Sequence, residues 1–152
     1  MFRVLLISGV FLIAHTAEAA PLDVYGNWLN EKQTSIIEIS DCEGSPCGTI
    51  IWIDHPAPET LIDDENPDPN LQAQPLLGLT ILQGFEARGD QWKKGRIYDP
   101  ASGKSYNSKL RRKDDDTLEV KGCVGPICQT QIWTPSAVSS SATASAVVPS
   151  GN

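Results

Sequence analysis

CEGSPCGTIIW at residues 42–52 and CVGPICQTQIW at residues 123–133 share one pattern, C-x-G-x-x-C-x-T-x-I-W. A glycine-containing turn between two cysteines, followed by Thr-x-Ile-Trp, predicts the tip of a β-hairpin and the strand that leaves it. The two copies hold all four cysteines of the chain. They therefore predict an all-β domain that is constrained near both of its ends.

The four cysteines can be joined in three ways. Local pairing, Cys42 with Cys47 and Cys123 with Cys128, fits a four-residue hairpin loop, because facing residues of an antiparallel pair lie within reach of a disulfide. Crossed pairing between the hairpins, free thiols and a metal site are the alternatives. The C-x4-C spacing is neither that of a zinc ribbon nor the C-x-x-C of a redox enzyme. We expect the local pairing.

The N-terminus has the features of an export signal. Arg3 precedes an apolar run over residues 4–14, and an A-x-A site ends at Ala19. This pattern predicts a signal peptide over residues 1–19, cleaved after Ala19, and a periplasmic or secreted protein. The apolar run is too short for a membrane span, so we expect no stable membrane insertion.

The composition of the C-terminus and the net charge of the chain limit the extent of the folded domain and the classes of partner. Residues 135–152 are almost entirely Ser, Ala, Thr, Val, Pro and Gly without a charged side chain, which predicts a flexible tail. One domain is then expected over residues 22–134. The net charge of −7, without a basic stripe, argues against nucleic acid as a partner.

Short apolar segments alternate with turns rich in Gly, Asp and Pro through the whole domain, and no run is typical of a long helix. The pattern predicts an eight-stranded antiparallel up-and-down β-barrel, with one long loop over residues 54–78 between the third and fourth strands. The eight expected strands are Tyr25–Glu31, Thr34–Ser40, Cys47–Ile53, Leu79–Glu86, Gln91–Tyr98, Lys104–Arg111, Thr117–Gly122 and Cys128–Thr134.

An ordered series of motifs resembles the exported bacterial proteins grouped as domain of unknown function 2147. The resemblance covers Tyr25 to Trp133 and implies a lipocalin-like (calycin) barrel without an established activity. The motifs are GNW at 26–28, CGTIIW at 47–52, DENPD at 64–68, PLLGL at 75–79, IYDP at 97–100, GKSY at 103–106, LEVKGC at 118–123 and QIW at 131–133.

Gly26-x-Trp28 is also similar to the short lipocalin signature, in which the Trp closes the base of the barrel under an Arg from near the barrel's end. The last expected strand ends Trp133-Thr134-Pro135, without a basic residue. The resemblance therefore implies that Arg111 or Arg112 substitutes.

The interior of an eight-stranded barrel is either filled by side chains or holds one small ligand. Our leading hypothesis is an exported protein that binds a hydrophobic small molecule. The alternative is a protein-interaction module with a filled core. Ser102-Gly103-x-x-Tyr106 favours it, because this motif resembles the loop of periplasmic lysozyme inhibitors. The candidate ligand-binding residues are Trp52, Phe85, Tyr106, Leu110, Leu118 and Val120.

Oxygen-bearing side chains gather in the long loop, and such groups are the ligands that Ca²⁺ prefers. Because the EF-hand pattern is missing, we expect these residues to cap turns instead, and we expect no metal and no cofactor. The four candidate ligands are Asp63, Asp64, Asn66 and Asp68.

His55 is the one histidine after the predicted cleavage site. It adjoins Asp54, but neighbouring strand residues point to opposite faces and no motif supplies a nucleophile. We therefore expect that the protein is not an enzyme.

Overall fold

The computed structural model describes residue 20 and residues 22–137. The predicted signal peptide and most of the predicted tail lie outside the described residues. No helix in the described part is long and apolar enough to cross a membrane.

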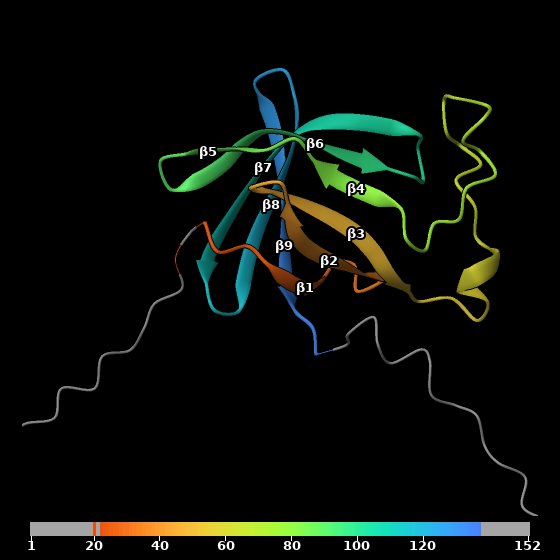
Figure 1. Ribbon diagram of the computed structural model, residues 1–152, viewed down its shortest axis with the longest axis horizontal. Coiled ribbons are helices and arrows are strands. Elements are labelled where there is room, and N and C mark those ends of the chain that lie inside the picture. Colours follow the sequence, from red (N-terminus) through yellow and green to blue (C-terminus); the bar gives the residue numbers. More distant parts are fainter. Residues whose placement is uncertain (1–19, 21, 138–152) are drawn as a thin grey trace, which may run out of the picture.

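The described chain forms nine β-strands and one short 3₁₀ helix, η1 (Pro58–Thr60) (Figure 1). All eight expected strands are present, with ends shifted by a few residues. The strands are β1 (Gly26–Leu29), β2 (Ser35–Cys42), β3 (Ser45–Ile53), β4 (Thr80–Gln83), β5 (Glu86–Arg88), β6 (Gln91–Asp99), β7 (Lys104–Asp114), β8 (Thr117–Val124) and β9 (Ile127–Pro135).

Eight of the strands close into an antiparallel barrel in the order β4-β3-β2-β1-β9-β8-β7-β6, and pairing of β4 with β6 completes the ring. This arrangement confirms the predicted fold class. The ninth strand, β5, follows β4 after a short interruption, and both strands pair with β6.

The fourth expected strand, Leu79–Glu86, is interrupted between β4 and β5. Gly84 has φ of +75°, which a side chain would disfavour, and this turn directs Phe85 into the barrel. The Phe85 ring packs on Gly95 of β6, where an added Cβ would overlap it. The interruption therefore inserts an aromatic ring into the core.

Because the strands alternate in direction, the turns gather at two ends of the barrel. We name the end that holds the turns at residues 43–44, 89–90 and 115–116 the base. The opposite end, the mouth, holds the long loop and the turns at residues 30–34, 100–103 and 125–126.

Both disulfides are local, Cys42–Cys47 at the base and Cys123–Cys128 at the mouth, so the expected pairing is confirmed. The expected four-residue loop is wrong, because each hairpin turns on two residues. At the mouth the two cysteines face each other, with their Cα atoms 4.0 Å apart. At the base Cys42 faces Ser45, so its disulfide crosses the hairpin diagonally.

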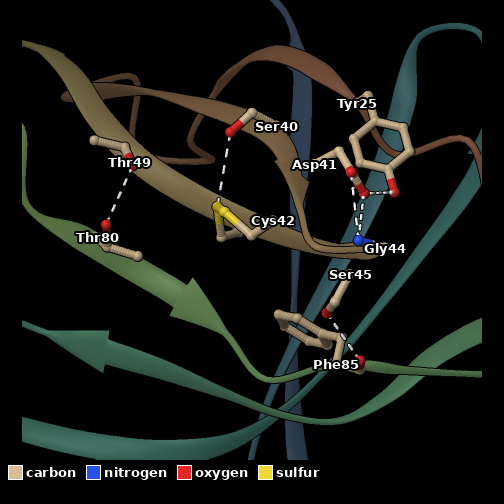
Figure 2. The surroundings of a disulfide bond; sticks show 10 residues. Tyr25, Ser40, Asp41, Cys42, Gly44, Ser45, Thr49, Thr80 and Phe85 are labelled. Carbon is tan, nitrogen blue, oxygen red and sulfur yellow. Dashed lines mark hydrogen bonds between the residues drawn. A yellow bond between two sulfur atoms is a disulfide. The ribbon is translucent and has the colours of Figure 1, made fainter.

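The base hairpin is also fixed to the interrupted strand (Figure 2). Glu43 and Gly44 both have positive φ, as a type I′ turn requires, and the Asp41 carboxylate accepts the Gly44 N–H. The Ser45 hydroxyl donates to the Phe85 carbonyl over 2.8 Å. The disulfide therefore lies beside the point where Phe85 enters the core.

Apolar side chains fill the half of the barrel nearer the base. The expected alternation holds in the base half of β7 and β8, where Ser108, Leu110, Leu118 and Val120 are buried and the residues between them, Lys109 and Glu119, are not. The largest fully buried side chains there are Trp28, Trp133, Ile37, Ile39, Leu82, Leu110, Leu118, Val24 and Val120.

Trp28 closes the base. Its indole N–H donates to the Val24 carbonyl over 2.9 Å, and the Arg112 guanidinium lies 5.4 Å from the centre of its ring. Arg112 also donates to the backbone carbonyls of Asp23 and Asp114. The arginine implied by the lipocalin resemblance is therefore Arg112, which β7 supplies instead of the last strand.

Replacing Arg112 with Gln should lower the free energy of unfolding by about 2 kcal/mol, because it removes a cation–π contact and hydrogen bonds from a charged donor. Arg111→Gln is the matched control. Its ion pair with Asp90 is exposed, and such pairs contribute less than about 1 kcal/mol. Urea unfolding of both variants measures the difference, and equal losses would contradict this role for Arg112.

Candidate functional site at the mouth of the barrel

The barrel is closed at its base but incompletely closed at its mouth, because β1 is short. Within the described part of the chain, β1 pairs with β9 only at Trp28 opposite Pro135 and Leu29 opposite Thr134. The edge of β9 that faces β1 therefore has no strand partner over residues 127–133. One side chain reaches it, since the Glu31 carboxylate accepts the Ile132 N–H over 3.3 Å.

The inner face of β9 is exposed to solvent above Trp133. Gln131 lies opposite Val120, Gln129 opposite Gly122, and Ile127 opposite Val124. Residues paired in this way share one face of the sheet, so these β9 side chains point to the inner side. Val120 is 1% exposed, yet Gln129, Gln131 and Ile127 are all exposed. The interior therefore opens beside β9.

Small residues lie between this open region and the filled core. Ser108 of β7 faces Gly95 on one side and Gly122 on the other. A side chain added at Gly122 would make only ordinary contacts, with Ile97 and Tyr106. The Ser108 hydroxyl is buried and has no hydrogen-bond partner in the described part of the structure.

Partly exposed apolar side chains surround the opening. Ile97 and Tyr106 face each other on β6 and β7, on the face of the sheet that holds Ser108, and both are half-buried. An opening with an apolar rim and a few polar groups, here Gln129 and Gln131, suits a small ligand.

The six ligand-binding candidates divide between two places. Leu110, Leu118 and Val120 come together on neighbouring strands, but in the filled half of the barrel, and Phe85 is buried against Gly95. Tyr106 lies at the mouth, as just described. Trp52 is also at the mouth end of β3, but it pairs with Ile36, the neighbour of the inward-facing Ile37, so its side chain lies on the outer face and does not join the site.

Sequence reasoning missed Ser108, Gln129 and Gln131 as site residues. The signal that was available is the run Cys128-Gln-Thr-Gln, where polar residues occupy both faces of a strand beyond the buried Trp133. Such a strand cannot have a wholly apolar inner face.

The long loop is held against the barrel by a buried carboxylate, Asp63, which is 0% exposed. Its Oδ1 accepts the Tyr98 hydroxyl of β6 over 2.7 Å. Its Oδ2 accepts the side-chain amides of Asn66 and Gln74 over 2.6 and 2.9 Å. Each Asp63 oxygen is therefore satisfied within the protein.

These contacts set the ionisation of both partners. Burial alone would raise the pKa of the Asp63 carboxyl, but the hydrogen bonds from Asn66, Tyr98 and Gln74 outweigh it and the pKa is lowered. Burial, together with the hydrogen bond to Asp63, raises the pKa of the Tyr98 hydroxyl to about 12. Asp63 is therefore a charged anchor at neutral pH.

The calcium candidates are used in the turns of this loop. The Asn66 amide oxygen accepts the Asp68 N–H, and Asp68 accepts the Asn70 N–H, both as Asx-turns. Asp64 is exposed, and Asp63 is occupied as above. Within the described residues no three His, Cys, Asp or Glu side chains form a group that could hold a metal ion.

Two other sequence candidates are used in turns at this end of the barrel. His55 is exposed, and its Nδ1 accepts the Ala57 N–H over 3.2 Å. The Ser102 hydroxyl donates to the Asp99 carboxylate inside the turn between β6 and β7, whereas Tyr106 lies on the inner face of β7.

Asp63→Asn should lower the free energy of unfolding by about 2 kcal/mol near neutral pH. The reason is that the NH₂ group of the new side chain would face a hydrogen-bond donor where a carboxylate oxygen of Asp63 accepts. The difference in free energy of unfolding between the wild type and Asp63→Asn should be at its full value above the ordinary carboxyl pKa of 3.8. It should shrink as the pH falls through the lower pKa that Asp63 has in the folded state. Urea unfolding at about pH 7 and about pH 2.5 tests this. The exposed Asp64→Asn is the control, and a pH-independent loss in Asp63→Asn would contradict the role of the charge.

Comparison with known proteins supports the fold. Protein HP1028 from Helicobacter pylori, described as belonging to the lipocalin family, is similar in structure with a TM-score of 0.69. The match covers 76% of this chain and 84% of that chain at 19% sequence identity, a level that speaks for the fold alone. No curated protein matches the sequence.

A family model described as "Uncharacterized protein conserved in bacteria (DUF2147)" matches residues 26–135, which span the barrel from β1 to the end of β9. The chain therefore belongs to the DUF2147 family of bacterial proteins.

Proposed function

We propose that this protein binds a small apolar or amphipathic molecule at the mouth of its barrel. The observation that carries the proposal is the exposed inner face of β9, where Ile127, Gln129 and Gln131 face the inner side without being covered. A lipocalin-like fold is compatible with such binding, although a fold by itself does not fix a function.

The proposal places the ligand nearer the mouth than the sequence did. Leu110 and Leu118 are each 0% exposed, and Trp28 and Trp133 are each 2% exposed. A core packed in this way offers no surface to a ligand without rearrangement. Tyr106 is the sequence candidate that stays in the site, and Ser108 lies beneath it.

A second candidate function, a protein-interaction module, is favoured by the edge of β9. An unpaired strand edge can accept an extended segment of a partner as an additional strand. Ile127 is 74% exposed at this edge, and no charged residue lies between Val124 and Pro135 to protect it. Binding of a small ligand at the inner face of β9 would favour the first function over the second.

The proposed setting is the periplasm or the external medium, after removal of residues 1–19. Two disulfides fit an oxidising compartment outside the cytoplasm. Binding is proposed and not catalysis, since His55 is exposed and its Nδ1 accepts the Ala57 N–H within a turn of the long loop.

Gln129→Trp should abolish binding of the neutral fluorescent probe N-phenyl-1-naphthylamine, because a large ring on the inner face fills the opening. Thr130→Trp is the matched control, since it adds the same ring to the next residue on the outer face. We expect saturable fluorescence enhancement in the wild type and in Thr130→Trp, and a loss of affinity of at least about tenfold in Gln129→Trp.

Both positions are exposed, so the two variants should unfold at similar urea concentrations. Absence of saturable probe binding in the wild type would contradict the proposed function. Equal affinities of the wild type and a folded Gln129→Trp would contradict its placement at the inner face of β9.

A further inference from the structure

The hairpin that joins β8 to β9 ends in exposed apolar side chains. Val124 and Ile127 are 68% and 74% exposed, the highest values among the large apolar side chains of the described chain. They face each other across the turn, and the hairpin projects from the barrel as the blue loop at the top of Figure 1. Neighbouring exposed apolar side chains, unlike single ones, indicate a surface that contacts a partner. We name residues 124–127 the apolar tip.

The apolar tip has a fixed shape. The Cys123–Cys128 disulfide lies directly behind it and joins facing residues of the two strands, whose Cα atoms are 4.0 Å apart. A hairpin that is constrained in this way loses little conformational freedom when it meets a partner, which lowers the cost of association.

Cations gather on the outer face of the sheet behind the apolar tip. Arg96 of β6 pairs with Asn107 of β7, and Asn107 also pairs with Cys123. One row nearer the base, Lys109 lies opposite Lys121. The residues beside Lys109 along β7 are buried, so this row points outward. We name Arg96, Lys109 and Lys121 the basic face.

The described structure does not compensate the charge of the basic face. Lysines directly opposite each other in a sheet repel. Within residues 22–137, no carboxylate lies within salt-bridge distance of the basic face, although ion pairs form at Arg88, Arg111 and Arg112. An anionic surface lying over the basic face would offset the repulsion between its cations.

The guanidinium of Arg96 is oriented by hydrogen bonds in place of an ion pair. One terminal nitrogen donates to the Asn107 side-chain oxygen over 2.9 Å, and the other donates to the Ser105 carbonyl over 3.1 Å. A guanidinium has five N–H donors, so these two bonds hold the group and leave donors for an anionic oxygen.

A hollow of 360 Å³ lies between Arg96 and the apolar tip. Its lining includes Arg96, Ser105 and Asn107 on the strands and Val124 and Gly125 of the apolar tip, and no Asp or Glu. An anionic group in this hollow therefore lies within reach of the guanidinium and beside the apolar side chains.

Most acidic residues of the chain lie elsewhere. Residues 22–86 carry twelve Asp or Glu and one Lys, whereas residues 87–137 carry six Asp or Glu and ten Lys or Arg. The long loop holds six of these acids. It joins β3 to β4, which are across the ring from β8 and β9, and in Figure 1 it lies apart from the apolar tip, in yellow and green. The basic face is thus locally positive on a chain of net charge −7.

Two acidic residues limit the basic face. Asp99 lies opposite Lys104 at the mouth end of β6 and β7, so Lys104, which also lines the hollow, is not counted in the basic face. Glu119 follows Lys121 on the outer face of β8 and lies opposite Arg111.

We propose that the β8–β9 hairpin docks on the surface of an anionic phospholipid bilayer, with Val124 and Ile127 in the interface and the basic face against the lipid phosphates. Lys121 lies three residues before Val124, which is about 10 Å along a strand. An apolar segment that enters the interface by about 5–10 Å therefore leaves the cations at the level of the head groups.

The arrangement favours a bilayer over an acidic protein. Either partner would attract the cations, but apolar side chains at the end of a projection, with cations set back behind them, match the two layers of a bilayer surface. Such docking is peripheral and reversible, because two side chains enter the interface and no segment spans the membrane. The inference goes beyond the proposed function and does not depend on it.

The test is co-sedimentation of the exported protein with vesicles. One set contains phosphatidylcholine alone, and the other contains phosphatidylcholine and phosphatidylglycerol in equal parts. The wild type should bind the anionic vesicles at least about tenfold more tightly than the neutral ones. Added salt should weaken this preference, because it screens the charges.

Val124→Ser/Ile127→Ser should lower the affinity for anionic vesicles at least about tenfold, because it removes the apolar surface that enters the interface. Ile62→Ser/Leu71→Ser is the matched control. It removes two exposed apolar side chains from the long loop, which are 45% and 43% exposed, and it should bind as the wild type does.

Arg96→Gln/Lys121→Gln should lose the preference for anionic vesicles. Lys93→Gln/Lys113→Gln is its control, because it removes the same charge from the base ends of β6 and β7. This control should keep the preference. Urea unfolding of all four variants verifies that each one is folded.

Equal binding of the wild type to both kinds of vesicle would overturn this inference. Unchanged binding of a folded Val124→Ser/Ile127→Ser, or an unchanged preference in Arg96→Gln/Lys121→Gln, would overturn it as well. Absence of binding to either vesicle would also overturn it and would leave the apolar tip and the basic face to an acidic protein partner. None of these results affects the proposed function, which binding of the neutral probe tests separately.

Discussion

The register between β1 and β9 is the constraint on which the rest of the structure depends. Two residue pairs join these strands, and both lie at the base end of β9. The barrel is therefore closed tightly where Trp28 meets the sheet, and it is left open along β9 towards the mouth. A longer β1 would cover that edge and the interior beside it. The filled base, the exposed inner face and the free strand edge all follow from this one short contact.

The two halves of the barrel have different physical tasks. At the base, Trp28, Arg112 and the buried aliphatic side chains remove apolar surface from water, which is the main favourable contribution to folding. The mouth contributes less burial, and there the structure relies on local constraints instead, namely the Cys123–Cys128 disulfide and the Asp63 contacts to β6. A rigid support beneath an open, less buried region is the arrangement that binding sites commonly use.

The sequence was sufficient to predict the strands, their order and the local disulfides, because period-2 alternation and turn residues are local signals. It could not place Phe85, whose strand is interrupted by packing on Gly95, a residue of another strand. The choice of Arg112 over Arg111 was available from the alternation, because Arg112 shares the inner face of β7 with Leu110 and pairs with Leu118. The open mouth was missed for the same reason as Phe85. Whether Gln129 faces a neighbour depends on where β1 ends, and within β9 the one signal is that polar residues occupy both faces over residues 129–131.

The most direct test of this account is amide hydrogen exchange along β9, resolved by NMR. The two-residue turn makes Val124 and Ile127 a hydrogen-bonded pair, so the Gln129 and Gln131 amides point to β8, whereas those of Cys128 and Thr130 point to the free edge. The Ile132 N–H, which reaches Glu31 on that side, fits this alternation. The account predicts slow exchange at Gln129 and Gln131 and fast exchange at Cys128 and Thr130. Equal protection of all four amides would mean that another strand covers the edge, and it would contradict an open mouth.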